Sequence, residues 1–453
     1  MKYLVTALFT LITTSALLVS SLPVNNTNDG VFESKLYPNL KMNFKTPDLC
    51  DPTVKQYSGY IDVTENDHYF FWFFESRQKP EKDPLTIWLN GGPGSSSMLG
   101  LWTELGPCRV NEDASQALYN EAGSWNKVSN LLFVDQPSEV GFSYGKSNVT
   151  NTEDAAQYMY IFLQIFYEAF PQYKPNDFHF FGESFGGRYV PTYADYIVQQ
   201  NKFKHVNHFQ IPLKSIGVGN GMMDPLIQNQ YYEKMTCNST YGPVVTKDIC
   251  ETMRLNTPIC AQLTKKCYET DDSQDCITAF TYCSYSVQYM YAIGGKSFYD
   301  IRTAAPISED YVGFINKTST LDAIGAKTQF KKLSEGVIAA FGTTGDRIKS
   351  SASHVTSLLN NNIPVLMYAG DADFICTHYG IQAWAEQLEF ENSQEFRNDK
   401  LKSWSMDGKE VGLIQQGGGL TYLRVYEAGH LVPTDQPEAA LKMFTDHIQL
   451  NLK

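Results

Sequence analysis

Short runs of apolar residues recur along the chain, and turn-forming residues such as glycine, proline and aspartate follow them. Such runs are typical of buried β-strands. They cover residues 68–74, 85–92, 130–137, 178–184, 215–221, 364–371 and 422–429. Helix-like stretches lie between or after them, for example 153–170, 188–200 and 436–450. Because strands alternate with helices, the sequence predicts an α/β fold with a mostly parallel, doubly wound sheet that is covered on both faces.

The alternation breaks between about residues 222 and 350. This segment is richer in cysteine, tyrosine, threonine and other polar residues, and strand character returns only at Ile363. We therefore expect an insertion that lies over the sheet as a cap, within one large domain that spans residues 22–453.

The first 21 residues have the pattern of a cleaved secretory signal peptide. A lysine stands near the start, an apolar run extends from Leu4 to Val19, and small residues follow. A membrane anchor is the alternative, but the run is short and is interrupted by threonine and serine. We expect a soluble protein outside the cytosol, with no membrane anchor.

Composition narrows the class of protein. The chain has 453 residues, of which 43% are hydrophobic and 13% aromatic, so it can bury a large core. Its net charge of −13 argues against binding to nucleic acid or to an anionic membrane.

Nine cysteines agree with an oxidising compartment. Six of them fall in the predicted cap, which we expect to be held together by disulfides. They are Cys237, Cys250, Cys260, Cys267, Cys276 and Cys283. A zinc site is the alternative, but no CxxC pair and no nearby histidine support it. Possible glycosylation sequons begin at Asn25, Asn148, Asn238 and Asn316.

The sequence GESFG places Ser184 between two glycines, after an apolar strand and before a predicted helix. A nucleophile elbow requires this context, because its sharp turn leaves room only for small flanking residues. A glycine-rich turn with a capping serine is the alternative. Gly187, which follows directly, favours the elbow.

A serine nucleophile needs a histidine as base and an acid that orients it. Among the histidines after the cap, His430 follows a strand directly, whereas His447 lies in the terminal helix as a surface or packing residue. For the acid, the stretch YAGDADF offers Asp371 and Asp373, and position alone does not distinguish them.

Acyl-transfer chemistry also needs two N–H groups that stabilise the oxyanion. Phe185 would supply one of them, and Gly92 in WLNGGPGSSS would supply the other. Glycines in this loop let the main chain approach a substrate closely.

Taken together, WLNGGPGSSS, ELGP, FVDQPSEVGFSY, GESFGGRYVP, GNG, YAGDADFIC and EAGHLVPTDQP resemble the serine carboxypeptidases. The resemblance extends from about residue 57 to 445. It implies an α/β-hydrolase fold with an inserted cap and a catalytic triad of Ser184, Asp373 and His430. Asp371 is then a structural residue.

The resemblance also implies a role for Glu183, the acid beside Ser184. In this family Asn90, Gly91, Glu104 and Glu183 bind the C-terminal carboxylate of the substrate, and Trp88 helps to hold them. Two carboxyls that lie close together cannot both ionise easily, so one keeps a proton and can donate it. The alternative for Glu183 is an acid that the dipole of the following helix stabilises.

Further expectations follow from the family. They are the disulfides Cys50–Cys108, Cys237–Cys250, Cys260–Cys283 and Cys267–Cys276, and a free thiol at Cys376 near the active site. That thiol is either reactive toward mercurials or buried and inert. Ser95 stands where many relatives have a bridged cysteine, and Phe185 helps to form the pocket for the side chain before the scissile bond.

The function that these features imply is a serine-type carboxypeptidase that acts on peptide and protein C-termini at acid pH. It would work as a monomer or homodimer, without metal or cofactor, either secreted or in the lumen of an acidic vacuole or lysosome. Two alternatives are an acyltransferase or esterase on the same fold, and a binding protein without activity. The intact carboxylate-binding set argues against the first, and the intact triad argues against the second.

Overall fold

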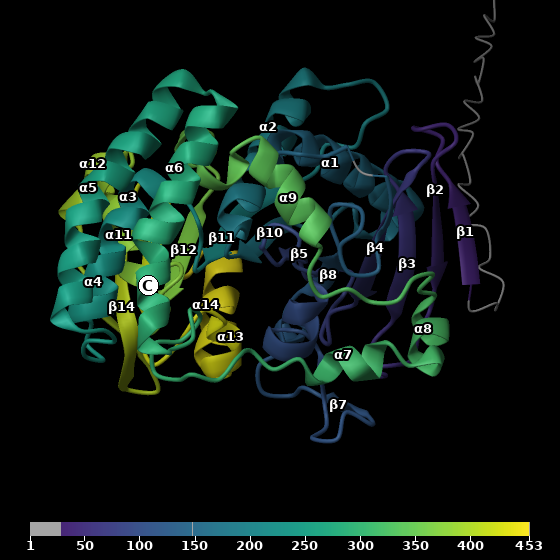
Figure 1. Cartoon of the computed structure of the whole chain (residues 1–453). Coiled ribbons are helices and arrows are strands. Elements are labelled where there is room, and N and C mark those ends of the chain that lie inside the picture. Colours follow the sequence, from purple (N-terminus) through teal and green to yellow (C-terminus); the bar gives the residue numbers. More distant parts are fainter. Residues whose placement is uncertain (1–28, 147, 453) are drawn as a thin grey trace, which may run out of the picture.

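One large β-sheet runs through the molecule, with helices on both of its faces (Figure 1). The computed structural model describes residues 29–146 and 148–452, so the predicted signal peptide and Asn25 lie outside the described residues. The strands in the middle of the sheet are parallel to one another. In spatial order they are β8 (Asn130–Val134), β5 (Leu85–Leu89), β10 (Phe178–Glu183), β11 (Leu213–Gly219), β12 (Val365–Gly370) and β15 (Leu420–Val425).

Antiparallel strands extend the sheet at both edges. Beyond β8 lie β4 (Asp67–Phe74), β3 (Gln56–Asp62), β2 (Lys41–Lys45) and β1 (Asp29–Glu33), and β9 (Tyr144–Gly145) pairs with β4. Beyond β15 lie β14 (Lys409–Gly417) and β13 (Lys402–Met406). A separate hairpin is made of β6 (Cys108–Val110) and β7 (Ala117–Tyr119). The sheet is therefore mixed, with a parallel centre, whereas the sequence predicted a mostly parallel one.

The central strands are buried on both faces, which explains their continuous apolar runs. In β4, Phe71 and Phe73 belong to one apolar cluster, and Phe70, Trp72 and Phe74 belong to a second cluster on the opposite face. Side chains alternate along a strand, so a strand covered on both sides needs apolar residues at every position.

Helices α1 (Thr152–Ala169), α2 (Gly186–Phe203), α10 (Ala352–Asn360) and α11 (His378–Gln387) contribute to the first cluster. Helix α14 (Pro437–Ile448) packs into the second cluster through Met443 and Phe444. Two shorter helices are α12 (Ser393–Asn398) and α13 (Val432–Asp435). The predicted helices at 153–170, 188–200 and 436–450 correspond to α1, α2 and α14.

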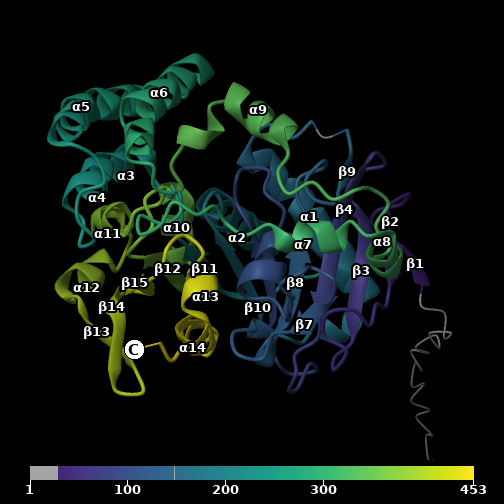
Figure 2. The ribbon, with the colours of Figure 1, turned by 60° about the horizontal axis from the view of Figure 1, so that its bottom comes forward.

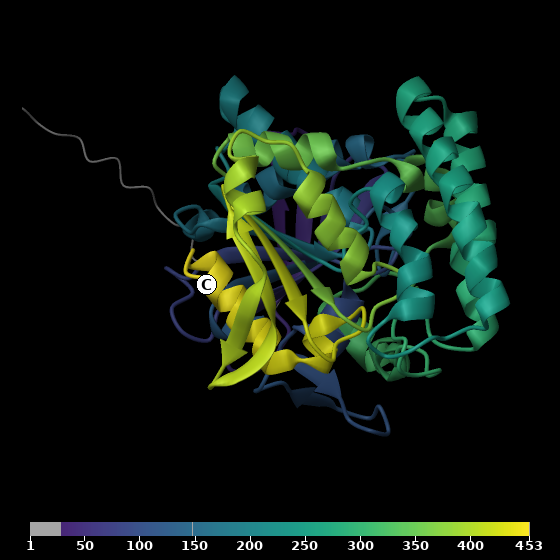
Figure 3. The ribbon, with the colours of Figure 1, turned by 90° about the vertical axis from the view of Figure 1, so that its left-hand side faces the viewer.

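The chain between β11 and β12 is mostly helical. Its helices before α10 are α3 (Pro225–Gln228), α4 (Tyr232–Asn238), α5 (Lys247–Thr270), α6 (Ser273–Ser286), α7 (Asp310–Ile315), α8 (Thr318–Ile324) and α9 (Glu335–Thr343). Figures 2 and 3 show α5 and α6 as a long pair that stands beside the sheet. Disulfides Cys260–Cys283 and Cys267–Cys276 join α5 to α6, and Cys237–Cys250 joins α4 to α5.

Short helical turns complete the fold: η1 (Gly100–Glu104), η2 (Trp125–Lys127), η3 (Pro171–Tyr173), η4 (Asn229–Tyr231), η5 (Gln288–Gly294) and η6 (Asp346–Ile348). Among the described residues, no helix is both long enough and apolar enough to cross a bilayer.

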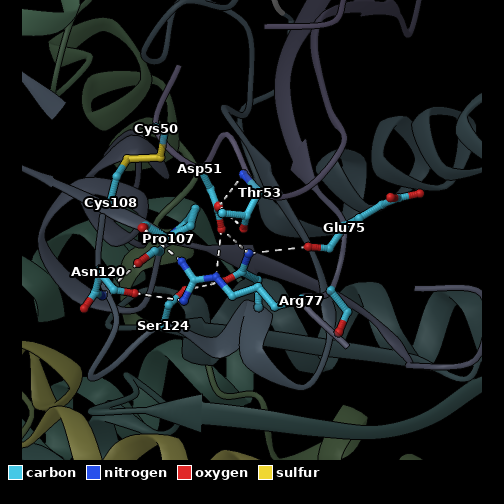
Figure 4. A network of polar contacts seen from close by, with 12 residues as sticks. Cys50, Asp51, Thr53, Glu75, Arg77, Pro107, Cys108, Asn120 and Ser124 are labelled. Carbon is cyan, nitrogen blue, oxygen red and sulfur yellow. Dashed lines mark hydrogen bonds and ion pairs between the residues drawn. A yellow bond between two sulfur atoms is a disulfide. The ribbon is translucent and has the colours of Figure 1, made fainter. Parts of the chain in front are cut away.

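A buried polar network fixes the chain just after η1 (Figure 4). Arg77 Nε lies 2.8 Å from Asp51 Oδ2, and its guanidinium also donates to the carbonyls of Asn120 and Pro107. The disulfide Cys50–Cys108 also joins the segment at Asp51 to the segment at Pro107. An ion pair with this many hydrogen bonds positions its segments well.

Candidate active site

Ser184 lies at the sharp turn between β10 and α2. Its φ of +60° is in the left-handed region, and its N–H donates to the carbonyl of Gly219 at 3.0 Å. The turn leaves no room for a side chain at Gly187, where a Cβ would lie 2.7 Å from the Met222 nitrogen. Strain and crowding of this kind are what a nucleophile elbow requires.

Asp373 and His430 follow the neighbouring parallel strands β12 and β15. The carboxyl ends of parallel strands meet at one edge of the sheet, the same edge at which β10 places Ser184. His430 Nδ1 lies 2.8 Å from Asp373 Oδ2, and both side chains are buried. The His430 N–H donates to the carbonyl of Tyr299 at 2.7 Å, which holds the loop in place.

Asp373 accepts hydrogen bonds on both of its carboxyl oxygens. Its Oδ2 accepts from the Asn220 amide at 2.7 Å and from the Cys376 N–H at 3.2 Å, in addition to facing His430. Its Oδ1 accepts from the Ile375 N–H at 3.0 Å. Asn220 was not among the predicted site residues, although GNG at the end of a predicted strand was the signal for it.

Asp371 has different partners. Its carboxylate accepts from the Tyr241 hydroxyl at 2.7 Å and pairs with Arg424 at 3.3 Å. The structure thus brings His430 together with Asp373 and not with Asp371. His447 is buried and contacts the carbonyl of Ile216, so it packs in the core.

The glycine loop lies directly against the elbow. A Cβ at Gly91 would lie 2.3 Å from the Phe185 nitrogen and 2.8 Å from the Ser184 Cβ, so no other residue fits there. Gly92 has a φ of +108°, which glycine tolerates best. Gly92 directly follows Gly91, which lies against Ser184 and Phe185, so the Gly92 N–H stays the predicted second oxyanion donor.

Two sets of hydrogen bonds hold this loop. On one side, the Ser96 N–H donates to the Lys332 carbonyl at 3.0 Å, and the Ser334 N–H donates to Gly94 at 2.9 Å. On the other side, buried Asp135 accepts from the Ser96 hydroxyl and the Ser97 N–H. Asp135 lies in FVDQP, but the sequence analysis did not single it out as a residue that positions the loop.

Asn90, Glu104 and Glu183 form a buried cluster beside Ser184. The Asn90 side-chain nitrogen donates to Glu104 Oε1 at 3.0 Å and to Glu183 Oε1 at 2.9 Å. The orientation of this amide is fixed because its oxygen accepts from Trp88 Nε1 and from the Gly100 N–H, both at 2.9 Å.

The carboxyl groups of Glu104 and Glu183 lie close enough for each to shift the pKa of the other. Burial raises the pKa of Glu183 well above its usual range, and the negative charge of Glu104 raises it further. Burial also raises the pKa of Glu104, although the hydrogen bonds from Glu183 and Asn90 act against this. A raised pKa means that the pair keeps a proton at pH values where an exposed glutamate has lost its own. The cluster can therefore both donate and accept hydrogen bonds.

Cys376 carries a buried free thiol next to Asp373 and His430. The ligand atoms of these three residues lie within 4.8 Å of one another, a spacing that a metal site would need. A metal fits poorly, because Asp373 Oδ2 is already occupied by donors. Burial raises the pKa of the thiol well above its usual value, so the thiol is protonated and a weak nucleophile.

The remaining predicted residues are the bridged cysteines and the glycosylation sequons. The disulfides of the structure pair the cysteines as the resemblance implies. Asn148 and Asn238 are exposed, whereas the Asn316 side chain accepts a hydrogen bond from the Phe330 N–H. Glycan attachment stays a prediction at each of these asparagines.

Curated relatives cover nearly all of this chain. It is 41% identical over 415 residues to the vacuolar serine-type carboxypeptidase ATG42 of Saccharomyces cerevisiae. The aligned region covers 88% of this chain and 80% of that protein. The chain is 40% identical over 428 residues to carboxypeptidase Y of Komagataella phaffii, with 92% and 80% covered. The carboxypeptidase Y of Schizosaccharomyces pombe is 40% identical over 90% of this chain, which spans 42% of that protein's length.

A solved structure has the same architecture. The crystal structure of a prohormone-processing carboxypeptidase of Saccharomyces cerevisiae superposes with a TM-score of 0.71 at 24% identity, over 90% of this chain and 94% of that one. The predicted α/β-hydrolase fold is confirmed. The sequence model of the family described as serine carboxypeptidase matches residues 47–450. The chain therefore belongs to the serine carboxypeptidase family.

Proposed function

We propose that this protein removes C-terminal amino acids from peptides and proteins at acid pH, through an acyl-enzyme intermediate. Ser184 Oγ attacks the carbonyl carbon of the last peptide bond while His430 takes the hydroxyl proton. The N–H groups of Gly92 and Phe185 stabilise the oxyanion. The C–N bond then breaks, and His430 gives its proton to the departing amine. Water then attacks the acyl-enzyme carbonyl while His430 takes its proton, and the shortened peptide leaves as His430 returns the proton to Ser184.

The observation that carries the proposal is the buried cluster of Asn90, Glu104 and Glu183 beside the nucleophile. A C-terminal carboxylate that reaches this cluster meets a carboxyl that still carries a proton, and it can share the Asn90 N–H groups, which already donate to Glu104 and Glu183. Both are donors, and hydrogen bonds to a charged acceptor are strong. Because Glu183 directly precedes Ser184, a carboxylate held there brings the last peptide bond to the serine hydroxyl.

The setting of the enzyme is part of the proposal. A secretory signal in residues 1–21 would deliver the chain to the secreted fraction or to an acidic lumen, where the glutamate pair keeps its proton. The segment 222–350 would act as a cap that shapes the cleft. The name of the yeast relative, a vacuolar carboxypeptidase, supports an acidic destination.

The pH dependence of two substrates tests the proposal. We expect kcat/KM for an N-blocked dipeptide to fall as pH rises through the raised pKa of the glutamate pair, by up to about tenfold per pH unit. An N-blocked amino-acid ester has no carboxylate for the pair to bind, so its kcat/KM should not fall over the pH range in which the pair loses its proton. Both profiles are measured from pH 4 to 8.

Glu183→Gln provides a variant that donates without titrating. Its kcat/KM for the dipeptide should be lower than that of the unaltered enzyme but should decrease less toward neutral pH. The pH dependence of its ester hydrolysis should be unchanged. Coincident peptidase and ester profiles in the unaltered enzyme would refute the role of the pair. Ester turnover without any release of amino acids from dipeptides would instead point to an esterase or acyltransferase.

A further inference from the structure

A cleft of about 570 Å³ opens beside the glycine loop. Gly92 and Leu99 line one side of it, and Tyr299, Ile338 and Arg347 line other parts. Because Gly92 is the expected oxyanion donor and Tyr299 holds the His430 loop, we expect a substrate at Ser184 to extend into this cleft.

Among the residues that the structure describes, the cleft contains one cation that no carboxylate neutralises. Of its charged residues, Glu309 and Lys332 pair with each other. Within residues 29–146 and 148–452, Arg347 has no ion pair and no hydrogen bond from its side chain, and its buried Nε has no acceptor. The guanidinium carbon instead lies 4.4 Å from the centre of the Phe280 ring. Burial lowers the pKa of Arg347, as happens to a cation without a compensating anion.

Arg347 and Glu104 belong to different parts of the fold. Arg347 belongs to η6, which packs against α6 and α9, whereas Glu104 belongs to η1, which packs against α13 and β6. Phe341 of α9 contacts the ring of Phe185, at 6.0 Å between centroids. A peptide whose last carboxylate faces Glu104 would therefore extend its preceding residues toward α9 and η6.

We propose that Arg347 selects peptides whose penultimate residue is acidic, by pairing with the carboxylate of that side chain. This inference rests on the proposed function and adds a substrate class to it. An aspartate or glutamate side chain in the cleft would give the unpaired guanidinium the planar, bidentate acceptor that arginine prefers. Its methylene groups would contact the apolar parts of the cleft, such as Ile338 and Tyr299.

Matched peptide pairs test this assignment. The first pair is N-blocked Glu-Phe and Gln-Phe, which differ in charge at the penultimate residue. The second pair is N-blocked Phe-Glu and Phe-Gln, which differ at the terminal residue. All are measured near pH 5.5, where a free glutamate side chain is ionised. We expect kcat/KM about tenfold higher for Glu-Phe than for Gln-Phe, since the site lies between exposed and buried.

The variant Arg347→Gln should reduce the Glu-Phe to Gln-Phe ratio to about one, and Arg347→Lys should retain part of the preference. Lys349→Gln is the matched control, because it removes a cation two positions away that pairs with Asp271 and does not line the cleft. Its ratio should equal that of the unaltered enzyme. Thermal unfolding and labelling by a serine-directed inhibitor verify that each variant is folded.

Three results would overturn the inference: a ratio near one in the unaltered enzyme, an unchanged ratio in Arg347→Gln, or an effect of Arg347 on the terminal pair alone. None of these contradicts the proposed function, which instead fails if no dipeptide releases its terminal residue.

Discussion

Replacing Ser184 with alanine should lower kcat for peptide release by about 10⁶-fold and leave the fold intact. The elbow presents this hydroxyl at the edge of the sheet where Asp373 and His430 meet, and acyl transfer has no nucleophile without it. The side chain becomes smaller, and its backbone hydrogen bond to Gly219 does not depend on the hydroxyl. Release of the terminal amino acid and thermal unfolding are measured on the same preparation.

A serine-directed sulfonyl fluoride gives an independent readout of this prediction. It should modify the unaltered enzyme once, at Ser184, and should not modify Ser184→Ala. Ser403→Ala, at an exposed serine of β13, serves as the control and should react and turn over normally. Substantial peptide release by Ser184→Ala would mean that another group is the nucleophile.

Asp373→Asn should lower kcat by about 10⁴-fold. Asp373 Oδ2 faces three donors, from His430, Asn220 and the Cys376 backbone, and Oδ1 faces the Ile375 N–H. An asparagine has to point its NH₂ group at some of these donors. If it faces His430, the imidazole must accept there and carry its proton on Nε2, so it can no longer take a proton from Ser184.

Asp371→Asn is the matched control for this change, two residues earlier in the same loop. Asp371 contacts Tyr241 and Arg424 instead of His430, so its loss should affect stability more than kcat. The pH dependence of kcat separates the two variants further, because only the tautomer change at His430 affects general-base catalysis. Equal losses of kcat in both variants would contradict the assignment of Asp373.

The sequence predicts the centre of the fold well, because burial on both faces forces continuous apolar runs. The runs at 130–137, 178–184 and 364–371 correspond to β8, β10 and β12. The outermost strands were missed because they are not buried on both faces and so lack continuous apolar runs. Strand β2, with the sequence KMNFK, is short and largely polar, and a strand at an edge can show many polar residues to solvent.

The candidate site was predictable where one short motif contains both the reactive residue and the turn that positions it. The elbow at Ser184 and the glycine loop at Gly91 are short segments whose function depends on local backbone geometry. Residues that act from a distance left weaker signals. Asn220 meets Asp373 only because β11 and β12 are neighbours in the sheet, although they are far apart in sequence.

Arg347 illustrates what the sequence could not predict. No motif near Arg347 predicts that it lines a cleft. Whether it has an ion pair depends on where the fold places the carboxylates. Its neighbour Asp346 already pairs with Arg188 and accepts from Thr152. The fold therefore pairs the nearest acid with Arg188, and within the described residues no carboxylate pairs with Arg347.

The central claim is that the cluster of Asn90, Glu104 and Glu183 recognises the free C-terminal carboxylate. The most direct measurement is the ratio of kcat/KM, at pH 4.5, for one N-blocked dipeptide as the free acid and as its C-terminal amide. Hydrogen bonds to a charged group predict a preference of about 10- to 100-fold for the free acid, reduced in Glu183→Gln. Equal rates for acid and amide, or a preference for the amide, would contradict recognition of the carboxylate by this cluster.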